Sequence, residues 1–418
     1  MGREVERCKK RKFLYFSVFV NLGLLLVFKY LGVLSQMVHD AVSFFGLSVD
    51  SPVVSFLLPI GVSFYIFQSL SYSIDVYKGS IGVERHLGRF AVYVSFFPQL
   101  LAGPIERASH LLPQFNSDVS FDVDRVLDGL KPILLGVFMK IVVADRIAPL
   151  VDAVYSDPFV YVGAPLVVAT YLFSFQIYCD FAGYSLMAVG LAQMFGIDII
   201  DNFRRPFFAT SVSDFWKRWH ISLVRWFNDY LYYPLGGYKV KPLRWVLNIL
   251  GVFLVIGFWH GADPKYLVWG LLNGFYLTVP ILLYKPRYSL LKSFGFLRCI
   301  RVPVVVKRLV VFHLFSLSIV FIKVKDLSAG LHILRNFHVV SDFPAPRVFG
   351  LTSYMNLYLA VFFVFVLVFI EVLQKDESFR FFLAKRHVLV RLFFYSFLML
   401  VIYLFGFFEE KPFIYYGF

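Results

Sequence analysis

The stretch LRWVLNILGVFLVIGFWHG, residues 243–261, carries one charged side chain near its start and is otherwise almost continuously apolar. A helix needs about 20 apolar residues to cross a bilayer, so this stretch predicts a transmembrane helix. It closes on His260, flanked by Gly257 and Gly261, a spacing of small residues that lets a second helix approach closely. A histidine placed there is a polar group at membrane depth, where such groups are costly and often functional.

The composition of the whole chain agrees with a membrane protein. Of its 418 residues, 59% are hydrophobic, 20% are aromatic and 16% are charged, whereas roughly 25% are charged in a typical soluble domain. A soluble protein of this size could not bury so much apolar surface. The composition therefore excludes an ordinary cytosolic enzyme, a disordered chain and a secreted disulfide scaffold.

The net charge of +14 is interpreted through the membrane rather than through nucleic acid. Basic residues in loops hold those loops in the cytoplasm and contact anionic headgroups. The loop 285–308 has seven Lys or Arg residues and no acid, so we expect it on the cytoplasmic side. The histidines and cysteines show no metal-ligand spacing, and no metal site is predicted.

Hydrophobic stretches recur along the chain and predict an all-α polytopic integral membrane protein with about 9–11 tilted transmembrane helices. The stretches 90–104 and 181–196 are short for a span, and Pro98 interrupts the first, so short re-entrant or interfacial helices are expected as well. The candidate segments are 13–34, 52–77, 90–104, 126–150, 159–179, 181–196, 213–233, 243–261, 265–284, 302–322, 351–374 and 388–408.

Three histidines, His220, His260 and His313, lie in strongly apolar surroundings. A neutral imidazole at the helix crossing near His260 suits a general base that takes a proton from a hydroxyl. A structural histidine that is hydrogen-bonded between helices fits the same residues. No second polar group accompanies His313 in the run 310–315, so it is interpreted as a core histidine.

Residues 213–230 are predicted to form an amphipathic helix around His220. Such a helix either lies in the membrane interface, anchored by Trp and Arg, or lines a polar cavity beside the reacting atoms. At helical spacing, one face carries the polar side chains Asp214, Arg218, Ser222, Arg225 and Asp229.

Basic side chains surround this segment. They either pair with a phosphate-bearing donor such as a coenzyme or are solvated loop charges that set the topology. They are Arg204, Arg205, Lys217, Arg218, Lys239, Lys241 and Arg244.

Several motifs occur in the order in which a known family carries them. The ordered set covers roughly residues 13–340 and resembles the membrane-bound O-acyltransferase superfamily, in particular its bacterial branch of alginate O-acetyltransferase membrane subunits. The motifs are LPIGVSFYIFQ (58–68), IDVY (74–77), LAGPI (101–105), DFAGYS (180–185), NFRRPF (202–207), DFWKRWHISL (214–223), DYLYYPLGG (229–237) and GFWHG (257–261).

The resemblance implies a bundle of tilted helices around a tunnel that crosses the membrane, with His260 catalytic and His220 as the second family histidine. Where the family often has a His-Gly pair after this element, the chain has Asn273-Gly274. Side chains expected to line the substrate passage are Trp216, Trp219, Trp259, Asp214, Arg218, Arg225 and Asn273. Those expected to bind the donor are Arg204, Arg205 and Lys217.

The resemblance also implies a domain organisation. We expect a basic cytoplasmic N-terminus at 1–12, a membrane-bound O-acyltransferase domain at 13–408 and a C-terminal tail at 409–418. Family members usually carry further hydrophobic segments before the region that matches Phe13 onward. The chain is therefore interpreted as a shortened form or as one with a misplaced start.

The expected activity is O-acyl transfer, with acetyl moving from acetyl-CoA, a substrate rather than a bound cofactor, toward a hydroxyl of an exported polysaccharide or cell-envelope glycan. The expected partners are the lipid bilayer, an extracytoplasmic acyltransferase protein and the polysaccharide acceptor, without nucleic acid. The expected location is the plasma membrane, which is the inner membrane in a Gram-negative cell. A D-alanyl or lipid acyltransferase of the same superfamily, a transporter or flippase, and an inactive scaffold remain as alternatives.

Overall fold

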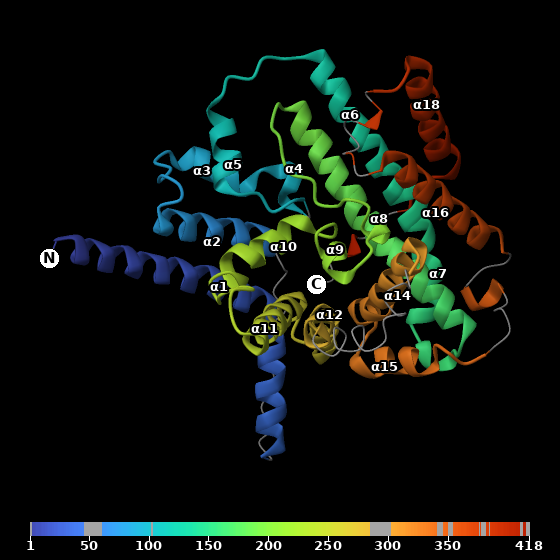
Figure 1. Ribbon diagram of the computed structural model, residues 1–418, viewed down its shortest axis with the longest axis horizontal. Coiled ribbons are helices and arrows are strands. Elements are labelled where there is room, and N and C mark those ends of the chain that lie inside the picture. Colours follow the sequence, from blue (N-terminus) through green and yellow to red (C-terminus); the bar gives the residue numbers. More distant parts are fainter. Residues whose placement is uncertain are drawn as a thin grey trace, which may run out of the picture.

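Helices make up every regular element in the described part of the chain, which confirms the predicted all-α class. Figure 1 shows α6 and α8 side by side in the middle of the molecule, with α1 projecting from one side. The computed structural model describes residues 2–45, 61–101, 103–284, 302–340, 346–349, 354–375, 377, 382–383, 385–409 and 413–414.

The described part of the chain is a series of helices. Elements labelled η are 3₁₀ or π turns. The elements are α1 (Gly2–Phe44), α2 (Val62–Lys78), α3 (Leu87–Ser95), α4 (Phe97–Leu100), α5 (Ala108–Leu111), η1 (Leu112–Asn116), α6 (Val123–Val137), η2 (Phe138–Ala144), α7 (Asp145–Tyr155), η3 (Pro158–Val160), α8 (Ala164–Met194), η4 (Pro206–Phe208), α9 (Val212–Trp216), α10 (Ile221–Phe227), η5 (Asn228–Tyr232), α11 (Pro242–His260), α12 (Pro264–Leu282), α14 (Val304–Lys323), α15 (Leu327–Asn336), η7 (Pro346–Phe349), α16 (Met355–Gln374) and α18 (Val388–Phe405).

Six helices in the described part of the chain are long and apolar enough to cross a membrane: α8, α11, α14, α16, α18 and the Lys10–Gly32 part of α1. This number is lower than the 9–11 expected, because several candidate segments have a different form. The segment 126–150 is helical throughout, but η2 gives its middle a π geometry. α12 carries buried Lys265 and Asn273 among its apolar residues. Residues 52–60 of the segment 52–77 and most of the basic loop 285–308 lie outside the described residues.

Two segments predicted separately, 159–179 and 181–196, form the single helix α8. No proline or other helix-breaking residue separates them, so the hydrogen-bond ladder continues through Asp180. The helix is apolar all round and 78% of its most hydrophobic window is buried, as expected for a helix at the centre of a bundle. Conversely, the segment 90–104 forms two short helices, α3 and α4, with Pro98 in the first turn of α4.

Glycines bring the backbones of α6 and α8 into direct contact at two points. A Cβ atom on Gly136 would lie 2.4 Å from the carbonyl oxygen of Gly183, and one on Gly129 would lie 2.5 Å from that of Gly190. In lipid, helices associate through close packing rather than through the hydrophobic effect, so a missing side chain is what permits this contact. The loop that follows α8 carries part of the site described below.

We expect Gly136→Ala to lower the free energy of unfolding by about 1–3 kcal/mol, because the added methyl group overpacks the contact with α8. The measurement is the thermal unfolding midpoint of the purified protein in one detergent. Gly251→Ala in α11 is the matched control, since a Cβ there meets nothing within 4 Å, and it should not lower the midpoint. Equal midpoints for both variants would contradict the contact.

Candidate active site

His260 lies at the end of α11, where α11 and α12 cross with their backbones in contact. A Cβ atom on Gly257 would lie 2.4 Å from the carbonyl oxygen of Tyr266, and one on Gly270 would lie 2.3 Å from that of Phe253. The crossing predicted from the glycine spacing is therefore confirmed. It leaves the His260 side chain 5% exposed, so the imidazole is enclosed by protein.

Aromatic rings enclose the imidazole of His260. The ring centroids of Trp259, Trp269 and Tyr266 lie 4.7, 4.9 and 6.4 Å from its centroid, and Trp216 lies 6.1 Å beyond, against Trp269. The indole N–H groups of Trp216, Trp259 and Trp269 are buried and have no hydrogen-bond partner among the described residues. Buried donors are normally paired, so the N–H groups of these three tryptophans can donate to a ligand that reaches them.

Residues 213–230 do not form the continuous amphipathic helix that was predicted. α9 and α10 are separated by a turn that ends at His220, whose φ of 43° lies in the left-handed region. The five polar side chains expected on one face are divided among α9, the turn, α10 and η5. The turn is held from outside, since the carbonyl of Asn202 accepts a hydrogen bond of 2.9 Å from the backbone N–H of Ile221.

The side chain of Asn202 holds His220 in place. Its Oδ1 accepts hydrogen bonds from the backbone N–H and hydroxyl of Ser222, at 3.2 and 3.0 Å, and lies 3.2 Å from His220 Nδ1. Because Oδ1 can only accept, Nδ1 carries the proton and Nε2 is the basic nitrogen of the neutral ring. The amide nitrogen of Asn202 donates to Ser185 on α8 at 3.3 Å.

The loop leading to Asn202 is fixed by the segment that follows the Leu-Ala-Gly-Pro-Ile motif. Glu106 accepts a hydrogen bond of 2.6 Å from the backbone N–H of Ile200. Gln114 accepts one of 2.7 Å from the backbone N–H of Asp198 and donates one of 2.9 Å to its carbonyl. Three hydrogen bonds therefore set the loop's path just before Asn202.

The other carboxylate oxygen of Glu106 lies 2.8 Å from His110 Nδ1. The hydrogen bond with Glu106, aided by its charge and that of Asp198, raises the pKa of His110 above its usual value. The pair therefore adds stability below about pH 6.5 that is lost as the pH rises through the raised pKa. With 40% of the His110 side chain exposed, solvent screens the pair and the effect is small.

The segments that carry the two predicted histidines share a neighbour. The ring of Phe67 lies 5.4 Å from that of Trp259, the residue before His260, and 4.5 Å from that of Trp226 in α10, the helix that begins after His220. Trp219, predicted to line the passage, is 3% exposed. Its ring packs 5.1 Å from Phe203 and 5.6 Å from Phe215. Trp219 is therefore part of the buried aromatic packing next to His220 in the sequence, together with Phe203 and Phe215.

Other predicted lining residues occupy different places. Asp214 accepts a hydrogen bond of 2.8 Å from Arg218 Nε, so these two side chains pair with each other. Arg225 is exposed on α10 and does not line a buried passage. Asn273 is buried and donates a 2.8 Å hydrogen bond to the carbonyl of Trp269, which steadies α12 beside His260.

The predicted donor-binding residues line two different pockets. Lys217 lines a mainly apolar cavity of about 540 Å³ between the α9–η5 segment, α11 and α12. Trp245, Tyr276 and Pro280 also line it, and Trp216 forms part of its wall. The cavity therefore reaches Trp216, whose ring packs on Trp269 beside His260.

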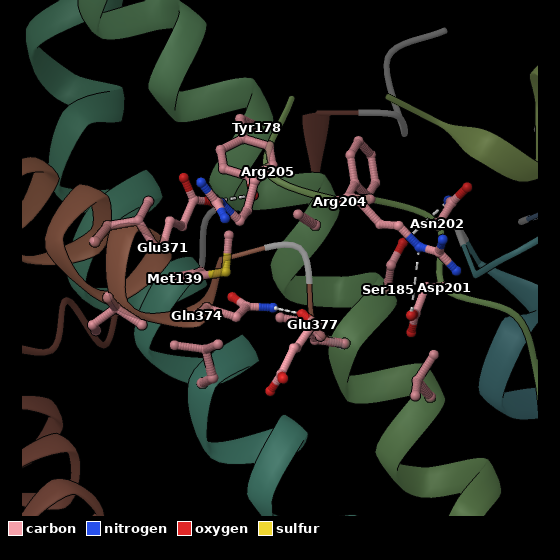
Figure 2. A pocket seen from close by; sticks show the side chains of 17 residues that line it. Met139, Tyr178, Ser185, Asp201, Asn202, Arg204, Arg205, Glu371, Gln374 and Glu377 are labelled. Atoms are coloured by element: carbon pink, nitrogen blue, oxygen red, sulfur yellow. Dashed lines mark hydrogen bonds and ion pairs between the residues drawn. The ribbon is translucent and has the colours of Figure 1, made fainter. Parts of the chain in front are cut away.

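Arg204 and Arg205 line the second pocket, shown in Figure 2, between α8, α16 and the loop after α8. Arg204 lies 3.9 Å from Asp201 as an ion pair. Arg205 lies beside Glu371, which also accepts a hydrogen bond from Tyr178. Carboxylates in this pocket thus compete with any anionic ligand for both guanidinium groups.

Sequence reasoning missed two residues of these sites. Glu371 is a buried acid within the apolar helix α16, and an acid in such a run is itself a signal of a specific role. Asn202 stands in the Asn-Phe-Arg-Arg-Pro-Phe motif, but its contact with His220 depends on the fold.

His313, which has no second polar group in its own run 310–315, has a polar partner on another helix. Tyr171, on α8, places its hydroxyl 2.7 Å from His313 Nδ1 on α14. The partner is 142 residues away in the sequence, so the local run could not reveal it. The pair links two helices and fits the expected structural role.

We expect Asn202→Ala to lower the free energy of unfolding by about 1–3 kcal/mol, because it leaves the buried donors of Ser222 and His220 without their acceptor. The thermal unfolding midpoint in detergent measures the effect. Asn116→Ala removes the same group from an exposed position and should change stability by less than about 0.5 kcal/mol. A similar small change in both variants would contradict the role of Asn202.

The chain is similar to known proteins. Residues 80–323 match the model of the membrane-bound O-acyltransferase family, MBOAT. The chain is 37% identical over 271 residues to a protein named as a probable alginate O-acetylase from Azotobacter vinelandii, covering 64% of this chain and 53% of that relative. The chain thus spans about half the length of that relative.

Two further relatives carry other names. A peptidoglycan O-acetyltransferase from Helicobacter pylori is 32% identical over 354 residues, covering 78% of this chain and 64% of the relative. A teichoic acid D-alanyltransferase from Bacillus subtilis is 28% identical over 238 residues, covering 54% and 59%. Because the family model covers more than half of the chain, the protein belongs to the membrane-bound O-acyltransferase family.

Proposed function

We propose that this chain is an O-acetyltransferase that moves acetyl from acetyl-CoA toward a hydroxyl of an exported polysaccharide or cell-envelope glycan. The observation that carries the proposal is the burial of His260 among aromatic rings and indole donors at the α11–α12 crossing. Family membership and the relatives named for alginate and peptidoglycan O-acetylation support it.

In the proposed reaction, His260 takes the proton of the acceptor hydroxyl as its oxygen attacks the thioester carbonyl. A carbon–oxygen bond forms and the carbon–sulfur bond of the donor breaks. The thiolate of coenzyme A leaves and recovers the proton from the imidazolium. An acetyl ester and free coenzyme A are the products, and no other reactant is needed.

The surrounding residues supply the remaining requirements. Buried indole N–H groups, such as that of Trp269, are suited to stabilise negative charge on the attacked carbonyl oxygen. His220, held by Asn202, orients the donor or stabilises developing charge. The tryptophan wall excludes water and so protects the thioester from hydrolysis.

The cavity at Lys217 is the proposed route of the donor. Its apolar lining suits the thin arm of coenzyme A, and the Lys217 ammonium suits a phosphate group. The arm would reach Trp216, which packs on Trp269 beside His260. Arg204 and Arg205 are proposed as secondary contacts, because acids already occupy their pocket.

The location and the partners of the protein are proposed from its family membership. We propose that the protein is integral to the plasma membrane, the inner membrane in a Gram-negative cell, and that an extracytoplasmic acyltransferase partner completes delivery. D-alanyl transfer is the second candidate, supported by the relative at 28% identity. Alkaline release of the ester and identification of the acid as acetate or D-alanine separates the two.

We expect His260→Ala to lower the acetyl ester content of the surface glycan by at least about 100-fold, because general-base catalysis is lost. The variant is expressed at matched membrane abundance in cells lacking the native protein, and the ester is measured after alkaline release. His220→Ala should also lower it, whereas His313→Ala, outside the site, should not. Unchanged ester in the His260 variant would refute the catalytic assignment.

A further inference from the structure

Two adjacent residues of α1 reach the last turn of α11. Lys29 Nζ donates a hydrogen bond to the carbonyl of Trp259, and the hydroxyl of Tyr30 donates one to the carbonyl of Phe258. These carbonyls immediately precede His260, the final residue of α11. In Figure 1, α1 passes beside α11 at this level.

Tyr30 and Lys29 also contact the side-chain rings of the two residues whose carbonyls they bond, Phe258 and Trp259. The ring of Tyr30 stacks on that of Phe258, with centroids 4.7 Å apart and planes 8° from parallel. Lys29 Nζ lies 5.3 Å from the centroid of Trp259. Tyr30 is 4% exposed and Phe258 is 45% exposed, so the stack is covered on the side of Tyr30 and open on the side of Phe258.

The chemistry of a helix end explains these contacts. The last carbonyls of a helix lack the usual partner one turn further along the helix and carry partial negative charge, which favours a cation. The carbonyl of Phe258 also accepts a 3.1 Å hydrogen bond from the backbone N–H of Gly261, so the hydroxyl of Tyr30 is its second donor. An ammonium group within a membrane span is costly unless it is paired. Lys29 lies in the predicted span Lys10–Gly32, and the end of α11 gives it a partner other than a carboxylate.

We propose that Lys29 and Tyr30 are positioning residues for His260, which hold the last turn of α11 from the side of α1. The inference rests on the proposed function. α12 contacts the same turn at Gly257, so two helices fix the backbone that carries the imidazole. α1 lies outside residues 80–323, which match the family model.

This brace of Lys29 and Tyr30 matters because His260 ends its helix. Gly261 follows in an extended conformation, and terminal turns are the part of a helix that frays. A displacement of about 1 Å at a reacting group can cost about 100-fold in rate. Loss of the brace should therefore lower kcat and leave binding of the donor largely intact.

The test measures acetyl transfer by purified full-length protein in nanodiscs, with acetyl-CoA as donor and a soluble glycan fragment as acceptor. Lys29→Met removes the charge, Lys29→Arg keeps a donor, and Tyr30→Phe removes one hydroxyl but keeps the ring. Ser17→Ala is the control on the same helix, because Ser17 bonds Ser73 of α2 at 2.8 Å and does not touch α11.

We expect Lys29→Met to lower kcat by about 10–100-fold with KM for acetyl-CoA nearly unchanged, Lys29→Arg to restore most of kcat, and Ser17→Ala to match wild type. Tyr30→Phe should lower kcat in the same direction by a smaller factor. If Lys29→Met does not accumulate, Tyr30→Phe decides. Wild-type kcat in both Lys29→Met and Tyr30→Phe, or an equal loss in Ser17→Ala, overturns the inference.

The design separates this inference from the function on which it rests. His260→Ala is measured in parallel in the same nanodiscs. An active His260→Ala variant refutes the proposed catalytic role. An inactive His260→Ala variant beside a fully active Lys29→Met variant refutes the positioning role alone.

Discussion

Direct contact between helix backbones at glycine residues is the constraint on which the site depends. Lipid tails are as apolar as the side chains they meet, so helices in a membrane gain little from burial and must pack closely to associate. At Gly257 and Gly270 the absence of side chains lets α11 and α12 touch. That contact sets the end of α11, and with it the imidazole of His260, inside an aromatic enclosure rather than against lipid.

The second histidine is positioned by a different principle, the need to satisfy buried polar groups. In a low dielectric an unpaired donor or acceptor is expensive, and a fully paired network is rigid. The side chain of Asn202 accepts hydrogen bonds from Ser222 and from the ring of His220, and it donates one to Ser185. It thereby supports a left-handed backbone at His220, a conformation that a residue with a side chain seldom adopts. Close packing thus positions His260, and hydrogen bonding of buried polar groups positions His220.

The sequence was informative where the cause is local. Apolar run length predicted the helical class, and the glycine spacing around His260 predicted the close crossing that the structure confirms. It failed where a distant residue decides. The break at His220 depends on Asn202, the partner of His313 is on another helix, and the division of Arg205 and Lys217 between two pockets depends on how loops fold. Lone charges in apolar runs, such as Lys29 and Glu371, were visible signals, but only the structure supplies their partners.

The central claim is that His260 is the base that meets the thioester at the inner end of the cavity lined by Trp216. An experimental structure of the full chain in nanodiscs with a non-hydrolysable thioether analogue of acetyl-CoA tests it most directly. The account predicts the analogue's arm in that cavity, with its carbonyl carbon about 3–4 Å from the position of an acceptor oxygen bonded to the imidazole. An analogue whose carbonyl lies in the pocket of Arg205 and Glu371, out of reach of His260, would contradict it.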